Sequence, residues 1–236
     1  MRGYTKRAIV LLALLVSLPL LAWGLFVVGL NGGIRNTILN MKPRPVPDSP
    51  VLRRDKTKFE AGLDTALQTA AANDRFVQYE TSTQDICYDG QNNFMFAEGF
   101  SHRCTLRLTR FYGFDGDFRK EMIDFEGGLL AAGWQSNDSY SMERYMTNYY
   151  DVRTNVTVEH IAHPFRYHRD ALELEIAWAE RKTQLLVSLD DIQRGYSVSS
   201  FYDQRHFTNA SELLQKVTTD HRYLLAIAIF GHYFEN

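Results

Sequence analysis

An uninterrupted apolar run lies near the amino terminus of the chain. Residues 8–30 are 23 consecutive positions without a charged side chain. A helix rises about 1.5 Å per residue, so a helix of this length can cross a hydrocarbon core of about 30 Å. The run lacks the polar stripe of a helix at the surface of a globular core, and it therefore predicts a transmembrane anchor.

A cleaved signal peptide is the alternative interpretation of this run. Arg2, Lys6 and Arg7 form the basic region that precedes the apolar part of a signal peptide. The apolar run is longer than the usual core of about 7–15 residues, and no clean small-x-small cleavage site follows it. We therefore expect an uncleaved single-pass anchor that follows a short tail at residues 1–7.

The segment after the anchor has a different pattern. Residues 31–56 contain four prolines at positions 43–50, interspersed with charged residues. This composition favours an extended chain and predicts a stalk. Residues 57–236 contain no internal repeat and no second linker, so we expect them to form one domain.

Within the domain, apolar residues recur at helical spacing in some segments and alternate with polar residues in others. The segment at residues 196–202 fits either a strand or an irregular stretch. The predicted helices lie at residues 58–72, between residues 117 and 133, and in a short stretch after Asn209. The predicted strands lie at residues 76–81, 105–112, 155–161, 172–179 and 183–189, and in the apolar segment that starts at residue 223.

The strand predicted at residues 172–179 has the most regular alternation. Its apolar side chains face one way, whereas Glu173 and Glu175 face the other, which predicts a solvated face and not an acid pair. The short connection after this strand predicts a hairpin to residues 183–189. The order of helices and mostly antiparallel strands predicts an α+β fold with helices packed on one face of the sheet.

Several residues have the spacing of helix caps. Asp115 and Asp117 precede a predicted helix, where carboxylates accept backbone N–H bonds and favour the positive end of the helix dipole. The alternative is a calcium loop, but the further ligands that such a loop requires are absent from the sequence. Gly133 stands where a carboxyl-terminal cap is expected, and Asn209 with Glu212 resembles a capping box.

Two cysteines decide the expected topology. Cys87 and Cys104 would close a loop of about 17 residues, and such a disulfide stabilises a domain by about 3 kcal/mol in an oxidising compartment. Two separate buried thiols are the alternative. Arg35, Lys42 and Arg44 follow the apolar run about as densely as basic residues precede it, so flanking charge alone does not orient the span. The disulfide favours a cytoplasmic amino terminus and an extracytoplasmic domain.

The charge of the domain restricts its partners. Of the 26 basic and 28 acidic residues in the chain, nine and two precede residue 57, which leaves the domain with a net charge of −9. An acidic domain is a poor match for nucleic acid, so we expect no nucleic-acid partner. We expect the membrane to be contacted by the apolar helix, and the domain to bind an envelope component or a membrane-protein partner of cationic or neutral character.

A histidine cluster is the main candidate for chemistry. His160, His163 and His168, with Asp170 or Glu159, could bind zinc or another transition metal. Their spacing differs from H-E-x-x-H, and in a strand the first two point to opposite faces. The sequence has no G-x-S-x-G, Walker A or G-x-G-x-x-G motif and predicts no cofactor. Ordinary histidines are therefore the favoured interpretation.

Two runs of the sequence carry a resemblance to a known group of proteins. CTLRLTRFYGFDGDF and the ending DHRYLLAIAIFGHYFEN, together with the anchor and the cysteine pair, resemble uncharacterised membrane-anchored envelope proteins of actinobacterial type. The resemblance covers most of the domain, implies a bacterial cell-surface setting and transfers no catalytic residue. The sequence thus predicts a non-catalytic envelope or partner-binding module. An envelope hydrolase that uses the histidine cluster is the alternative.

Overall fold

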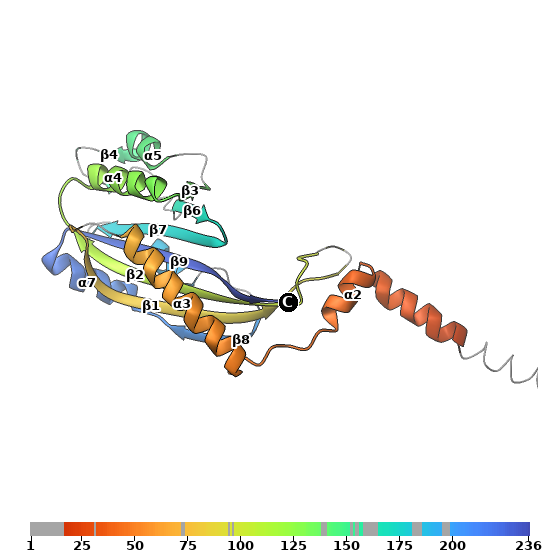
Figure 1. The fold of residues 1–236 in the computed structure, drawn as a ribbon. Helices are drawn as coiled ribbons and strands as arrows, with labels where there is room; N and C mark the ends of the chain where they lie inside the picture. The colour runs from red at the N-terminus through yellow and green to blue at the C-terminus, as the bar shows by residue number, and fades with distance from the viewer. Residues whose placement is uncertain are drawn as a thin grey trace, which may run out of the picture. The chain divides into compact units, whose positions relative to one another are not determined.

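The computed structural model describes residues 17–30, 32–71, 74–93, 95, 97–137, 141–151, 153, 156–157, 165–180, 186–194 and 199–236 (Figure 1). These residues divide into two compact units, which we describe separately. The N-terminal unit consists of Met1–Pro45, Asp89–Arg103 and Glu235–Asn236, and the main unit consists of Val46–Tyr88 and Cys104–Phe234.

A seven-stranded sheet with the order β3-β6-β7-β9-β2-β1-β8 forms the centre of the fold. The pairs β1–β8, β3–β6, β6–β7 and β7–β9 are antiparallel. The α+β class with a mostly antiparallel sheet is therefore confirmed. The strands are β1 (Val77–Asp89), β2 (His102–Phe114), β3 (Gln135–Ser136), β6 (Phe165–Arg169), β7 (Leu172–Glu180), β8 (Ser200–His206) and β9 (Tyr223–Glu235), and β4 (Tyr150–Asp151) pairs with β5 (Val156–Thr157) in a small second sheet.

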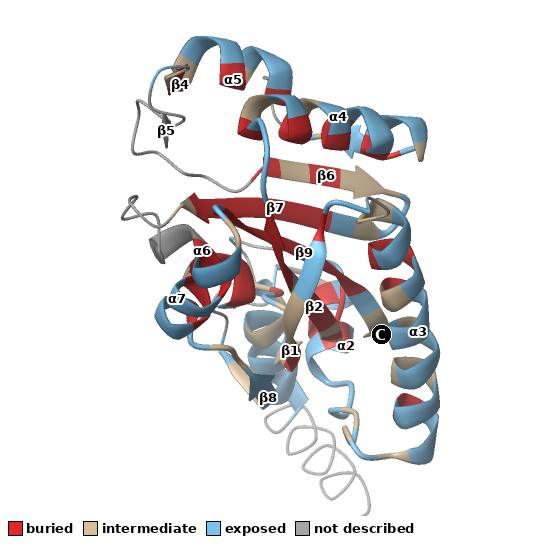
Figure 2. Ribbon diagram, turned by 90° about the vertical axis from the view of Figure 1, so that its left-hand side faces the viewer, coloured by how far each residue is buried: buried red, intermediate tan, exposed pale blue. Residues whose placement is uncertain are grey.

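Helices cover both faces of the large sheet, so the prediction of a single covered face was wrong. Buried residues of α3, α4 and α5 pack on one face, and those of α6 and α7 pack on the other. Figure 2 shows α6 and α7 on one side of the strands and α3 on the opposite side. The helices are α2 (Ile34–Asn40), α3 (Pro50–Ala70), α4 (Phe118–Ala131), α5 (Met142–Tyr149), α6 (Leu186–Arg194) and α7 (Ala210–Asp220).

The two faces differ in the size of their side chains. We call one the large-residue face, which the central strands line with Leu174, Ile176, Trp178, Leu225, Ile227 and Ile229. We call the other the alanine face, which the same strands line with Ala177, Ala179, Leu224, Ala226 and Ala228. Alternate residues of a strand point to opposite faces, so β7 and β9 contribute to both cores at once.

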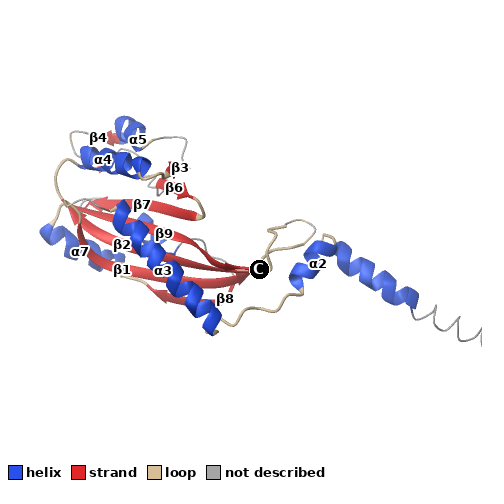
Figure 3. Ribbon diagram, in the orientation of Figure 1, coloured by secondary structure: helices blue, strands red, loops and turns tan. Residues whose placement is uncertain are grey.

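Helix α3 begins earlier than the sequence pattern predicts. The expected start near residue 58 was wrong, because the helix starts at Pro50. The Ser49 side chain caps it by accepting a hydrogen bond from the Leu52 N–H at 3.4 Å. Proline is favoured in the first turn, where its missing N–H costs no hydrogen bond. The predicted stalk at residues 31–56 therefore contains α2 and the first turns of α3, which runs obliquely across the large-residue face (Figure 3).

Three of the predicted caps are confirmed. Asp117 caps α4 by accepting from the Lys120 N–H at 3.2 Å, and Asn209 caps α7 by accepting from the Glu212 N–H at 3.3 Å. Gly133 follows α4 with a φ of 87°. Glycine adopts this left-handed conformation with little strain, which explains why the helix ends there.

The strand predicted at residues 183–189 and its hairpin were wrong. Leu186–Arg194 is helix α6, and β7 pairs with β6 and β9. A short apolar run does not distinguish a strand from a buried helix by its period. Leu189 and Ile192, three residues apart, are both buried against the alanine face, as helical spacing requires. Of the strand predicted at residues 155–161, Val156–Thr157 is β5 and the rest lies outside the described residues.

The N-terminal unit begins with an apolar helix at Ser17–Leu30, and residues 8–16 lie outside the described residues. Among the described helices, none alone has the length and hydrophobicity of a membrane span. The helix Ser17–Leu30 and α2 have this character only as a pair, with an angle of 86° between them.

Candidate functional site

A cleft of about 680 Å³ lies along α3 in the main unit. Side chains of α3, of the β6–β7 hairpin and of β9 line it. The apolar part of the lining is Phe59, Leu63, Ala66 and Leu172, and the polar part includes Asp55, Lys58, Arg169, His232 and Tyr233. Natural ligand sites have volumes of about 300–1,000 Å³ and combine apolar walls with few polar groups, so this cleft has the size and lining of a binding site.

Two glycines shape the cleft. Gly231 lies on β9 beneath α3, and a Cβ atom there would be 2.8 Å from Cζ of Phe59 and 3.0 Å from the carbonyl oxygen of Ala171. Its missing side chain thus lets α3 and the β6–β7 hairpin approach the sheet. Gly62 lines the cleft from α3, and a Cβ atom there would meet no atom within 4 Å. The absence of a side chain at Gly62 helps to keep the cleft open.

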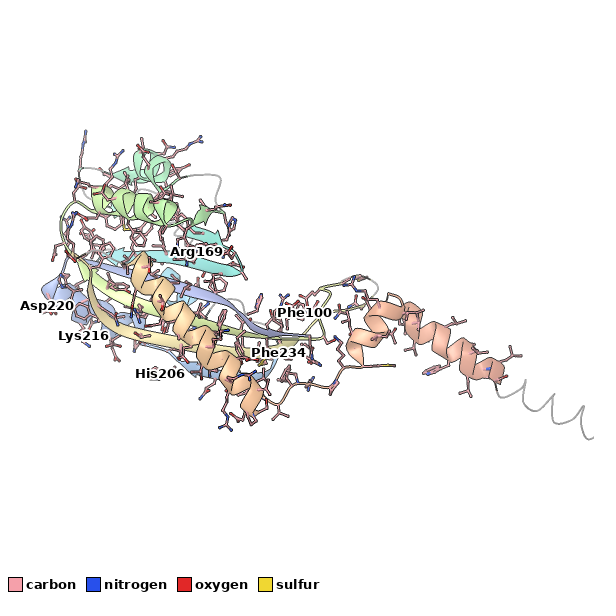
Figure 4. All side chains as sticks on the ribbon, in the orientation of Figure 1. Phe100, Arg169, His206, Lys216, Asp220 and Phe234 are labelled. Carbon is pink, nitrogen blue, oxygen red and sulfur yellow. A yellow bond between two sulfur atoms is a disulfide. The ribbon has the colours of Figure 1, made fainter. Side chains whose placement is uncertain are left out.

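Arg169 provides a fixed positive charge at the cleft. Its guanidinium carbon lies 4.7 Å from the centroid of the Trp134 ring, and its Nη1 donates to the Ala132 carbonyl at 3.2 Å. Figure 4 shows Arg169 at the end of the β6–β7 hairpin. Within the described part of the chain, no carboxylate forms an ion pair with Arg169 or with Lys58, although Asp55 also lines the cleft. The lining therefore contains two basic side chains and one carboxylate, although the domain as a whole is acidic.

The floor of the cleft is held by a hydrogen-bonded cluster. The Tyr233 hydroxyl donates to Oδ1 of Asp85 at 2.9 Å, and Nζ of Lys56 lies 2.7 Å from Oδ2 of the same carboxylate. Burial, followed by the charge of Asp85 and the hydrogen bond to it, raises the pKa of Tyr233. The phenol therefore stays protonated and serves as a donor, and the cluster ties α3 to β1 and β9.

The predicted disulfide is present beside this cluster. Cys87 on β1 and Cys104 on β2 are bonded to each other, and both residues are fully buried. The Tyr233 hydroxyl lies 3.7 Å from Sγ of Cys87. Because the chain has only these two cysteines, no thiol is free to act as a nucleophile.

The predicted histidine cluster receives no support as a metal site. His168 lies on β6, and its Nδ1 is hydrogen-bonded to Oδ1 of Asn137. His160 and His163 lie outside the described residues. Among the residues that the structure describes, no group of three histidine, cysteine or carboxylate side chains could hold a metal ion.

Asp115 is not a helix cap, which corrects the prediction for this residue. Its carboxylate accepts hydrogen bonds from the Arg222 N–H and from Nδ1 of His221, each at 2.8 Å. Burial opposes ionisation of Asp115, but these two hydrogen bonds outweigh it and lower its pKa. No described hydroxyl is hydrogen-bonded to His221, so the pair lacks a nucleophile. It joins the turn after β2 to the turn before β9.

Glu175 is buried, so the prediction of a solvated glutamate was wrong at this position. Its carboxylate pairs with Arg107 at 2.8 Å and with Arg166 at 3.0 Å. Arg107 also donates to the Ile192 carbonyl of α6 at 2.9 Å and lies over the Phe230 ring. The two arginines come one each from β2 and β6, so no local pattern in the sequence signals this cluster. Helix α6 covers the cluster, which is therefore structural.

The cleft along α3 is the candidate site that the described residues support best. It combines apolar walls with a positioned guanidinium, and its residues come from three segments that are distant in the sequence. Comparison of the chain with protein families, with curated proteins and with solved structures finds no match.

Proposed function

We propose that this chain is a single-pass membrane protein whose extracytoplasmic domain binds an envelope compound in the cleft along α3, without chemical change of the ligand. The ligand has an apolar body and one anionic group. The observation that carries this proposal is the juxtaposition of an apolar wall with Arg169, which has no carboxylate partner among the described residues.

The location rests on two features of the chain. The uncharged run at residues 8–30 has the length of a membrane span, and the disulfide between Cys87 and Cys104 is typical of an oxidising compartment. Together they favour a cytoplasmic amino terminus and a domain on the outer side of the membrane. Envelope compounds with lipid parts are present at that location.

The chemistry of the ligand follows from the lining. Phe59, Leu63 and Leu172 offer apolar surface, whose burial by a ligand is favourable by about 25 cal/mol per Å². A guanidinium binds a carboxylate or phosphate through two parallel hydrogen bonds. The Trp134 ring and the Ala132 carbonyl already hold Arg169 in place, so little side-chain entropy is lost when an anion binds.

A variant that fills the cleft tests the proposal. Gly62→Phe places a ring in the cleft and improves helix propensity, and Gly127→Phe makes the same change at an exposed position of α4 outside the cleft. The full chain in phosphatidylcholine nanodiscs is titrated with a medium-chain fatty acid that carries a dansyl group, and empty nanodiscs provide the background. We expect Gly62→Phe to weaken binding about tenfold or more. Gly127→Phe should bind as the wild type does.

The charge requirement is tested with the same assay. Arg169→Gln should weaken binding of the dansylated acid and leave binding of the corresponding dansylated alcohol unchanged. Equal binding of the acid to the wild type and to Gly62→Phe would show that the cleft is not the site and would overturn the proposal.

A further inference from the structure

The short helix α2 buries Asn36 and Thr37 together with Leu39, and it exposes large apolar residues. Ile34, Ile38 and Met41 are 69%, 57% and 74% exposed, whereas Asn36 and Thr37 are each only 8% exposed. Met41 is the C-cap residue directly after α2 and keeps a helical conformation, so the three exposed apolar residues follow the helical spacing i, i+4, i+7 and lie on one side. A helix that packs on a globular core in water has the opposite arrangement.

Hydrogen bonds within the N-terminal unit fix this orientation. Nδ2 of Asn40 donates to the Asn92 carbonyl at 2.8 Å, in the segment that connects β1 with β2. Just after α2, the Lys42 carbonyl lies 2.9 Å from Nε2 of His102. Nδ1 of the same imidazole lies 2.9 Å from Asp89, which also pairs with Arg44. The polar side of α2 is thus occupied, and its apolar side is directed away from these partners.

The angle between α2 and the helix before it indicates what the apolar side of α2 contacts. The angle between the helix Ser17–Leu30 and α2 is 86°. If the first helix follows the membrane normal, α2 lies parallel to the membrane surface. Lys42, two residues after the end of α2, is exposed, so it can reach phosphate groups at the level of the lipid headgroups.

We propose that α2 is an interfacial helix, whose side formed by Ile34, Ile38 and Met41 inserts into the phospholipid bilayer at the boundary between headgroups and acyl chains. Amphipathic helices of this kind bury their apolar side about 5–10 Å into that boundary. The proposal rests on the membrane anchor of the proposed function and is independent of the α3 cleft. Its consequence is a fixed orientation of the N-terminal unit on the membrane, because α2 is bonded to the segment between β1 and β2.

Site-specific fluorescence in liposomes tests the proposal. Both native cysteines are in the disulfide, so one introduced cysteine is the only site for a thiol-specific label. Ile38→Cys places a bimane label on the apolar side of α2. Leu130→Cys is the matched control, because Leu130 is an exposed apolar residue of α4 in the main unit. The full chain is reconstituted in phosphatidylcholine liposomes, with and without bromine on the acyl chains, and flotation measures membrane association.

We expect brominated lipid to quench the label at position 38 about threefold more strongly than the label at position 130, and aqueous iodide to give the reverse order. Equal quenching at the two positions in a chain that floats with the liposomes would overturn the interfacial helix and leave the anchor intact. A chain that does not float would overturn the anchor and the interfacial helix together. Binding of the dansylated acid in the α3 cleft depends on neither result.

Discussion

The two faces of the central sheet are built from the same strands but are covered in different ways. The large-residue face meets α3, α4 and α5 through branched and aromatic side chains. The alanine face meets α6 and α7 mainly through small side chains of β7 and β9, with Phe111 of β2 and Leu224 of β9 beside them, and it also contains the buried Arg107–Glu175 pair. The first face is stabilised by the volume of its side chains, whereas the second depends on close approach of the helices and on satisfied polar groups.

This difference determines which substitutions each face tolerates. Removing volume from the large-residue face leaves a cavity, because close-packed surroundings relax only in part. Adding volume to the alanine face displaces a helix. A charge on the alanine face is tolerated only with its partner, because α6 excludes water from it.

The largest effect is expected from breaking the ion pair on the alanine face. Glu175→Leu leaves the Arg107 guanidinium buried without a carboxylate, which should lower the free energy of unfolding by about 3–5 kcal/mol. The measurement is urea unfolding of the full chain in nonionic detergent, followed by near-ultraviolet circular dichroism. Glu173→Leu, at an exposed glutamate on the same side of β7, should change stability by less than about 0.5 kcal/mol.

A double variant distinguishes the pair from simple packing. Arg107→Met combined with Glu175→Leu removes both charges, so it should recover most of the loss caused by Glu175→Leu alone. If the double variant is no more stable than Glu175→Leu, burial of an unpaired charge is not the cause of the loss.

The next largest effect is expected on the large-residue face. Ile227 on β9 is fully buried, and Ile227→Ala should lower the free energy of unfolding by about 3 kcal/mol through the cavity that it creates. Ile227→Val should cost only about 1 kcal/mol. Equal losses in the two variants, measured by the same urea unfolding, would show that the face tolerates lost volume.

The smallest effect is expected where volume is added to the alanine face. Ala226 on β9 lies opposite Ala177 on β7, and both are buried beneath α6 and α7. Ala226→Leu should cost about 1–3 kcal/mol by overpacking, and Ala226→Gly serves as the control that adds no volume. A gain in stability for Ala226→Leu would mean that the face has unfilled space, which contradicts the comparison.

Local signals in the sequence were sufficient for much of the fold. The strand at β7 and the caps at Asp117 and Asn209 depend on residues close in the chain, and the structure confirms them, although it buries both faces of β7. Alanine is small enough to face either solvent or a helix. The alanines of β7 and β9 therefore do not show from the sequence that helices cover the alanine face. The burial of Glu175 depends on arginines from β2 and β6, which a single strand pattern does not reveal.

The candidate site was harder to predict from the sequence than the fold. The cleft joins α3, the β6–β7 hairpin and β9, and none of these segments contains a motif of its own. Gly231 is the one local sign, because a glycine inside a strand often marks close approach of another segment. The guanidinium of Arg169 is held in place by the ring of Trp134, which is distant from it in the sequence.

The position of β9 in the sheet has a consequence for biosynthesis. This strand lies between β7 and β2, yet it follows all its sheet partners in the sequence. Until residue 223 and those after it have been synthesised, β3, β6 and β7 have no hydrogen-bonded connection to β1, β2 and β8, so the growing chain holds two incomplete half-sheets. The central sheet can therefore be completed only late in biosynthesis, after nearly all of the domain has been synthesised.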